Sequence, residues 1–358
     1  MEPRTTLPSG VTSLVATLAI LVAGLGAAHA QDPVFSQYTA APVYTNPALV
    51  GLFEGEVRVV ANYREQWSSV LGSEAIRTYA ASGELRFNMG GRDYLALAAN
   101  ALQDNGGVAR YSITRAGFGV ALQKYLSGGR GRDATYLGLG GRVGYGQNRI
   151  DADNLWFSHN FDSVTTTITP DGSVGTSGGF IGATRGYLDV SGGINLAVVR
   201  HHYSLVVGIA AHHLNQPNAS FVFNSEERLA PRYSALLSGE YLIDDHLRLM
   251  PSAIYEYQDK AQRLTAGGGV YYRTGHEGDA AVRAGIYGRL TNRLDDGMYL
   301  SAIVLNGQLE FKRMTVGLSY DLNTGAVGRA TDGRGAYELS FSWTRPGRSR
   351  YKVVCPKL

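Results

Sequence analysis

From about residue 55 onward, the chain alternates apolar and polar side chains in short runs, and none of these runs is apolar for long enough to cross a membrane as a helix. The last run is the clearest: it places Tyr337, Leu339, Phe341 and Trp343 on one side of an extended segment and Glu338, Ser340, Ser342 and Thr344 on the other. Because successive strand side chains point to opposite faces, this period of two indicates a strand between lipid and a wet lumen. The pattern predicts an all-β fold, a transmembrane antiparallel β-barrel.

Residues 1–30 have the features of a secretory signal peptide. Met1 and Arg4 supply positive charge, residues 11–25 are apolar, and Ala28-His29-Ala30 is a small-x-small cleavage motif. A retained membrane anchor is the alternative, but the apolar core is short and lacks a stop-transfer flank. We expect cleavage after Ala30 and a mature chain that begins at Gln31.

The composition narrows the class of protein further. The hydrophobic fraction of 44% is lower than we expect for a helical membrane protein, and the 358 residues include only 1 Cys. An exported chain with a single cysteine, Cys355, cannot form an internal disulfide, so packing or a closed hydrogen-bond ladder must hold it together. The net charge is +3 and the basic residues are scattered, which gives little support to nucleic-acid binding.

About fourteen segments have the length that a tilted membrane strand needs. They run over residues 55–67, 76–89, 93–102, 110–126, 133–147, 187–200, 202–214, 230–243, 245–257, 262–274, 278–290, 297–306, 308–320 and 335–346. Such a barrel encloses more space than inward side chains can fill, so the lumen is a water channel or holds a plug. We therefore expect an N-terminal plug or periplasmic segment at 31–54, the barrel at 55–346 and a periplasmic tail at 347–358.

The connections alternate in length. The longest, at 148–186, 215–229 and 321–334, are odd-numbered, whereas the tightest, Arg200-His201-His202, Asp244-Asp245 and Asn306-Gly307, are even-numbered. Outer-membrane barrels have short periplasmic turns and long outer loops. With the amino end in the periplasm, the odd-numbered connections are expected outside the cell.

The polar rows of the strands are expected to face the lumen. In the first strand this row contains Arg58, Asn62 and Arg64, and in the second it contains Glu84. Pro251 interrupts an otherwise regular strand and lacks a ladder donor, so we expect a β-bulge at that position.

Catalytic motifs receive little support, and we predict no enzyme, no cofactor and no metal site. Adjacent residues of a strand point to opposite faces, so His201 with His202, or His212 with His213, cannot chelate one ion as a pair. The sequence has no Gly-x-Ser-x-Gly elbow, and its glycine-rich stretch at 138–146 lacks the end of a phosphate loop. A barrel enzyme acting on lipid or protein would need a nucleophile or acid pair that the sequence does not identify.

Several sequence words resemble those of the PorP/SprF family, outer-membrane proteins of the type IX secretion system and gliding machinery of Bacteroidetes. These words are QDPVFSQYTAAPVYTNPALVG at 31–51, NYREQW at 62–67, AHHLNQPNASF at 211–221, LSYDLN at 318–323, AYELSFSW at 336–343 and the terminal CPKL. The resemblance implies a non-enzymatic barrel in the outer membrane. It also implies three kinds of partner: periplasmic peptidoglycan-linked and ring components, secreted cargo with a carboxyl-terminal signal domain, and outer-membrane lipid.

The family words also nominate individual residues. Candidate partner or plug contacts are Gln31, Asp32, Pro33, Phe35, Ser36, Gln37, Tyr38, Asn46, Pro47, Arg64 and Trp67, with Cys355 and Pro356 in the tail. We interpret Phe35, Tyr38 and Tyr44 as anchors against the barrel wall, and we expect Arg64 to pair with Asn46 in the lumen. A plug with purely structural duties is an equal alternative. The tail is interpreted as a docking thiol, a segment held by a periplasmic partner, or simple chain termination.

Two functions follow from these features. The leading hypothesis is a component that supports secretion or surface anchoring of large cargo through protein contacts. The alternative is a passive porin or hydrophobic-solute channel. Conductance in planar bilayers would separate them, because a porin needs an open, charged lumen.

Overall fold

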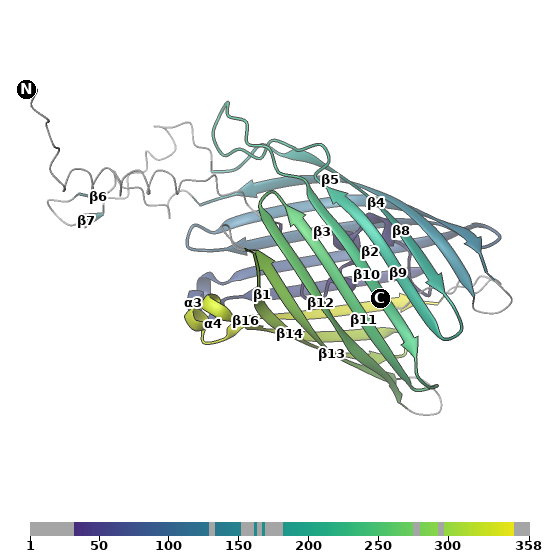
Figure 1. The fold of residues 1–358 in the computed structure, drawn as a ribbon. Helices are drawn as coiled ribbons and strands as arrows, with labels where there is room; N and C mark the ends of the chain where they lie inside the picture. Colours follow the sequence, from purple (N-terminus) through teal and green to yellow (C-terminus); the bar gives the residue numbers. More distant parts are fainter. Residues whose placement is uncertain are drawn as a thin grey trace, which may run out of the picture. The chain divides into compact units, whose positions relative to one another are not determined.

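The computed structural model describes residues 32–128, 133–151, 161–162, 167–168, 182–274, 280–292 and 297–346. Within these residues, fourteen antiparallel strands form one closed barrel (Figure 1). The barrel strands are β1 (Val57–Gln66), β2 (Ile76–Gly90), β3 (Asp93–Gly106), β4 (Tyr111–Ser127), β5 (Ala134–Arg149), β8 (Tyr187–Val199), β9 (Tyr203–His212), β10 (Arg232–Leu242), β11 (Leu247–Gln258), β12 (Ala261–Thr274), β13 (Ala280–Asn292), β14 (Met298–Phe311), β15 (Met314–Asn323) and β16 (Arg334–Arg345). Two short strands, β6 (Phe161–Asp162) and β7 (Thr167–Ile168), pair only with each other.

The barrel closes where its first and last strands meet. The pairing of β1 with β16 runs without interruption from Val57 opposite Arg345 to Gln66 opposite Ala336. Hydrocarbon offers no hydrogen-bond partner to an open sheet edge, so closure is what allows this sheet to lie in a membrane. The predicted fourteen-stranded antiparallel barrel is confirmed. No helix among the described residues is long and apolar enough to cross a membrane.

The two faces of the wall divide as the alternation predicts. On β1 and β16, Val59, Leu339 and Phe341 are exposed on the outer surface. Arg64 and Glu338, one residue out of phase with them, are buried on the inner side. The period of two thus places apolar side chains toward lipid and charged ones toward the lumen.

Two details of the strands differ from the sequence-based expectations. The connection between β14 and β15 lies at Lys312 and Arg313, whereas Asn306 and Gly307 are within β14 and pair with β15. A turn was expected here because Asn-Gly is a common turn pair. The expectation was wrong, because Leu309 and Phe311 continue the outward apolar row of β14 beyond this pair.

Pro251 does not form the expected bulge. It lies opposite Gly268 of β12 in a continuous register. On its other side, β10 and β11 keep one register across a short gap in their pairing, from Ser238 opposite Ser252 to Tyr241 opposite Leu249. The missing donor of proline is therefore accommodated by a gap in pairing instead of an inserted residue.

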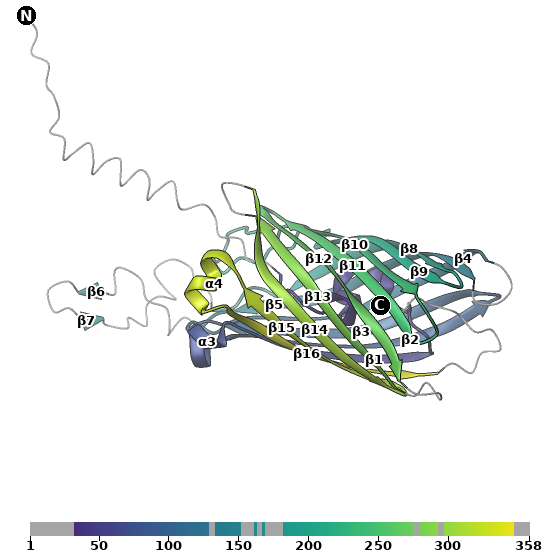
Figure 2. The same cartoon turned by 60° about the horizontal axis from the view of Figure 1, so that its bottom comes forward.

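The short helical elements lie outside the strands. Two of them, α3 (Ser68–Leu71) and α4 (Gly325–Thr331), belong to the β1–β2 and β15–β16 connections and lie at the same end of the barrel (Figures 1 and 2). A second group precedes β1: η1 (Tyr38–Ala40), α2 (Pro42–Thr45) and η2 (Pro47–Leu49). We call residues 33–53, which contain this second group, the inner segment, because hydrogen bonds tie it to side chains on the lumenal face of the wall.

Candidate functional site in the barrel lumen

The start of the inner segment is held by a buried cluster of charges. The Ser36 hydroxyl donates to Asp321 Oδ1 of β15 at 2.7 Å, and it accepts from Arg64 Nη1 of β1 at 2.5 Å and from Arg289 Nη2 of β13 at 2.7 Å. Both guanidinium groups also bind Asp321 Oδ2, at 2.8 Å from Arg64 and 2.7 Å from Arg289. Since one hydroxyl contacts three buried charged groups, it fixes the segment to three strands.

A carboxylate of β16 completes this cluster. Glu338 accepts the backbone N–H groups of Ser36 at 2.7 Å and of Gln37 at 3.2 Å. The Gln37 amide donates to the Glu338 carbonyl at 2.9 Å and accepts from the Ser340 hydroxyl at 2.7 Å. Glu338 is fully buried and also lies 3.5 Å from Arg64. The cluster therefore balances two arginines with two carboxylates, as burial of charge requires.

Aromatic side chains hold the next turn of the segment. The Tyr38 hydroxyl donates to Ser252 Oγ of β11 at 2.8 Å, and the Tyr38 ring packs edge-on against Tyr287 of β13. Tyr44 accepts a hydrogen bond from Asn100 of β3 at 3.2 Å. Phe35 packs against Tyr44 within the same segment.

The middle of the segment is a tight turn fixed by amide groups. Asn46 donates to the carbonyls of Ile194 on β8 and Ile209 on β9, at 3.2 and 3.1 Å, and accepts from the Ala48 N–H at 2.8 Å. The Ala48 carbonyl in turn accepts from Gln123 of β4 and from Asn195 of β8, each at 2.6 Å. The polar groups of this buried turn are thus bound to the wall, which lowers the cost of removing them from water.

Glycines of the wall leave room for this turn. A Cβ atom added at Gly140 of β5 would lie 2.4 Å from the Pro47 carbonyl oxygen and 2.5 Å from Ala48 Cα. A Cβ at Gly193 of β8 would lie 2.0 Å from Asn46 Oδ1. Only glycine permits so close an approach of the wall to the segment, so the wall has a complementary recess for it.

The end of the segment meets a second charged group. Glu84 of β2 accepts the Gly51 N–H at 2.8 Å and forms two hydrogen bonds with Arg58 of β1, each 2.9 Å long. Arg86 donates to the Phe53 carbonyl at 2.5 Å, and the Arg58 guanidinium lies 4.6 Å from the centre of the Phe53 ring. The chain passes from this group directly into β1.

The contacts show the direction in which the segment runs. Arg64 and Asp321, which hold Ser36, lie near the ends of β1 and β15 that lead into α3 and α4. Glu84 and Arg86, which hold Gly51 and Phe53, lie near the opposite ends of the strands. The inner segment therefore crosses most of the lumen, and its start lies at the end of the barrel that carries α3 and α4.

The structure brings together many of the residues nominated from the sequence. Ser36, Gln37, Tyr38, Asn46, Pro47 and Arg64 are in or against the inner segment, as described above, and Pro33 is partly exposed near its start. Trp67 follows β1, adopts a left-handed backbone (φ 62°), and donates its backbone N–H to the Gly335 carbonyl at 2.9 Å. Asp32 is the first described residue, whereas Gln31, Cys355 and Pro356 lie outside the described residues.

One expected contact is wrong. Arg64 does not pair with Asn46: Arg64 binds Ser36, Asp321 and Glu338, while Asn46 binds backbone carbonyls of β8 and β9. The two residues are held by opposite regions of the wall. The partners of each residue are distant in the sequence and come near it only in the closed barrel. Sequence reasoning did not identify Asp321, Glu338, Arg289 or Glu84 as site residues. Their polar positions in the strand alternation were the available signal.

A smaller buried network lies beyond Tyr44. Asp189 of β8 binds Arg142 at 3.1 Å and the His213 ring at 2.7 Å, and Arg142 also donates to Asn100. Among the residues that the structure describes, no group of three or more His, Cys, Asp or Glu side chains is arranged to hold a metal ion. The site consists of binding contacts between a segment and the wall around it.

These features define the class: an outer-membrane β-barrel whose lumen contains a segment of its own chain. The family model described as "Type IX secretion system membrane protein PorP/SprF" matches residues 27–343, and the chain belongs to that family. The resemblance seen in the sequence words is confirmed, as is the outer-membrane location.

Several solved channels are similar in fold. The toluene transporter TbuX of Ralstonia pickettii is 12% identical, with a TM-score of 0.48 and coverage of 86% of this chain and 94% of that one. The toluene transporter TodX of Pseudomonas putida is 10% identical, with a TM-score of 0.47 and coverage of 84% and 91%. CymD, a monoaromatic hydrocarbon channel, is 10% identical, with a TM-score of 0.49 and coverage of 87% and 94%. No curated protein matches the sequence.

Proposed function

We propose that this barrel has no catalytic activity and supports secretion or cell-surface anchoring of large cargo through protein contacts. The observation that carries the proposal is the inner segment, which is tied to strands on all sides of the lumen by buried hydrogen bonds and ion pairs. A porin gains its function from an open charged lumen, whereas here many charged lumenal groups bind the segment or one another.

The partners that we propose follow from membership in the family. They are the periplasmic peptidoglycan-linked and ring components of the machinery, secreted cargo with a carboxyl-terminal signal domain, and outer-membrane lipid. The tail with Cys355 and Pro356 is proposed to be held by a periplasmic partner. Residues 1–30 are proposed to be a signal peptide, which amino-terminal sequencing of the mature protein would test.

We further propose that the end with α3 and α4 faces the outside of the cell. The connections at this end include 213–231 and 324–333, whereas the longest connection at the opposite end, 128–133, has six residues. Short turns such as Asp259-Lys260 also occur at the α3 and α4 end, so the two ends differ in their longest connections. Short turns are typical of the periplasmic side of outer-membrane barrels. In this orientation the start of the inner segment lies at the outer mouth, although the sequence pattern was interpreted with the amino end in the periplasm. Ser36 is buried there, so cargo or a surface partner would reach the partly exposed Pro33.

Gene deletion tests the proposed function directly. Loss of the gene should abolish surface display of a specific cargo and leave the uptake of small solutes unchanged, and an intact copy of the gene should restore display. Purified protein in planar bilayers should carry no large steady current. A large current together with unchanged cargo display would instead establish a passive channel.

A further inference from the structure

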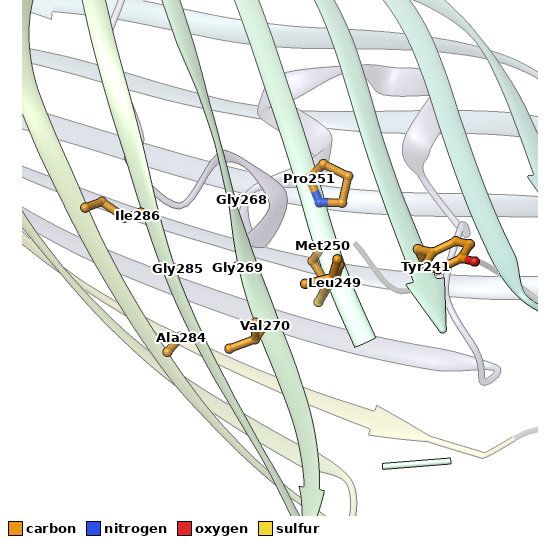
Figure 3. A pocket seen from close by; sticks show the side chains of 10 residues that line it. All are labelled: Tyr241, Leu249, Met250, Pro251, Gly268, Gly269, Val270, Ala284, Gly285 and Ile286. Carbon is orange, nitrogen blue, oxygen red and sulfur yellow. The ribbon is translucent and has the colours of Figure 1, made fainter. Parts of the chain in front are cut away.

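The outer surface of the barrel wall contains an apolar pocket of about 670 Å³ that spans β10 to β13 (Figure 3). Tyr241, Leu249, Val270 and Ile286 form its raised sides, and each of these side chains is exposed on the outer face of the wall. No charged residue lines the pocket. Its opening is therefore continuous with the surface that faces lipid.

The strand register explains why the wall is hollow here. Pro251 of β11 lies opposite Gly268 of β12, and Gly268 lies opposite Ile286 of β13. Residues that lie opposite each other share a face of the sheet, so Pro251 and Gly268 also point outward. The next row contains the larger side chains Leu249 and Val270, also opposite each other. Ala284 of β13 lies opposite Val270 in that row. Pro251, Gly268 and Ala284 are thus short residues between larger outward side chains, and the difference in length leaves a pocket in the lipid-facing surface.

The chemistry of the pocket selects its occupant. A water molecule needs two to four polar partners, which these apolar walls do not supply. An empty pocket would deprive its lining atoms of dispersion contacts on one side. The surrounding solvent is hydrocarbon, so an acyl chain is the molecule that can fill the space without burying an unsatisfied polar group.

The floor of the pocket is also the wall that holds the inner segment. Met250, Gly269 and Gly285 line both this pocket and a cavity of about 40 Å³ on the lumenal side, which also borders Thr39 of the inner segment. Ser252, which accepts the Tyr38 hydroxyl, borders the same small cavity. An occupant of the outer pocket would pack against the strip of wall that anchors Tyr38.

We propose that this pocket is a binding site for one acyl chain of an outer-membrane phospholipid. The acyl chain lies in the recess over Pro251 and Gly268, between the side chains of Leu249 and Ile286. By filling the recess, it supports the strip of β11 and β12 behind which the inner segment is anchored. The site is independent of the cargo function proposed above.

The test uses the full-length protein in vesicles of phosphatidylethanolamine and phosphatidylglycerol. The probe is a phosphatidylethanolamine with one diazirine-bearing palmitoyl chain, and mass spectrometry locates the adducts after illumination. We expect adducts on peptides that contain Leu249 and Val270 to exceed, by several-fold, those on the lipid-facing peptides of β2.

A pair of glycine substitutions makes the test specific. A Cβ added at Gly268 would lie 3.5 Å from its nearest neighbours, so Gly268→Leu should fit and fill the pocket. Gly83→Leu is the matched control, because Gly83 lies opposite the lipid-facing Val59 and an added Cβ there has no neighbour within 4 Å. Heat-dependent gel mobility verifies that both variants are folded.

Gly268→Leu should reduce the adducts at the pocket several-fold, and Gly83→Leu should leave them unchanged. Adducts spread evenly around the barrel would overturn the proposal. So would adducts at the pocket that persist undiminished in folded Gly268→Leu. Loss of cargo display is not the readout, so failure of the cargo proposal would leave this result unaffected.

Discussion

Arg64 of β1 and Asp321 of β15 form an ion pair of 2.8 Å although their strands are not neighbours, since β16 lies between them. The Ser36 hydroxyl binds both groups, and Ser36 also donates its N–H to Glu338 of β16 itself. The start of the inner segment therefore joins the three strands at which the barrel closes. Closure of the sheet and placement of the segment depend on the same contacts.

The first prediction concerns the charge balance of this cluster. Arg64→Ala leaves Asp321 with only Arg289 as a cationic partner in a buried site, so we expect a loss of about 3 to 5 kcal/mol in the free energy of unfolding. Denaturant unfolding in lipid vesicles would measure it. The matched control is Arg334→Ala, whose partner Asp332 is largely exposed, where the expected change is about 0 to 1 kcal/mol. Equal effects of the two variants would contradict the assigned role.

The sequence predicted the strands because a period of two is a local property, which each segment displays by itself. The contacts of the lumen are not local: Ser36 and Asp321 are 285 positions apart. The alternation in the sequence indicated that Arg64 and Glu338 face the lumen. Their partners could not be predicted in the same way, because these depend on which strands lie nearby in the closed barrel. The incorrect pairing of Arg64 with Asn46 arose in this way.

The recess for the inner segment also depended on the register between distant elements. Gly140 could be read as a residue that permits bending, but its close approach to Pro47 follows only from how the segment is seated. Pro251 shows the same limit at the level of one strand. Its missing donor was evident from the sequence. Whether the strand forms a bulge or leaves a gap in pairing depends on the residues beside Pro251 on the adjacent strands, Gly268 and Gly239.

The second prediction tests the recess with two adjacent glycines. Gly140→Ala places a Cβ 2.4 Å from the Pro47 carbonyl, where backbone atoms of two elements must move apart. Overpacking of this kind typically costs about 1 to 3 kcal/mol. At Gly141 the nearest atom to an added Cβ is 3.8 Å away, so Gly141→Ala should be neutral. Faster hydrogen exchange of residues 42–50 in Gly140→Ala alone would verify the prediction, and identical exchange in both variants would refute it.

The third prediction concerns the lumen itself. A chain lacking residues 33–50 retains every barrel strand but loses the segment that binds Asn195, Gln123 and Glu338. Water would then solvate these lumenal groups, and the conductance of single barrels in planar bilayers should rise well above that of the intact protein. Should the truncated and intact barrels conduct alike, the inner segment would not be what limits passage through the lumen.

The fourth prediction tests the orientation of the barrel in cells. In a Cys355→Ser background, which removes the natural cysteine, Val70→Cys places a thiol on α3 and Lys312→Cys places one in the β14–β15 turn. Both positions are exposed and lie at opposite ends of the barrel. A membrane-impermeant maleimide should label Val70→Cys on intact cells and Lys312→Cys only after the outer membrane is permeabilised. The reverse pattern would place the start of the inner segment at the periplasmic mouth, and its proposed contact would then have to be a periplasmic component.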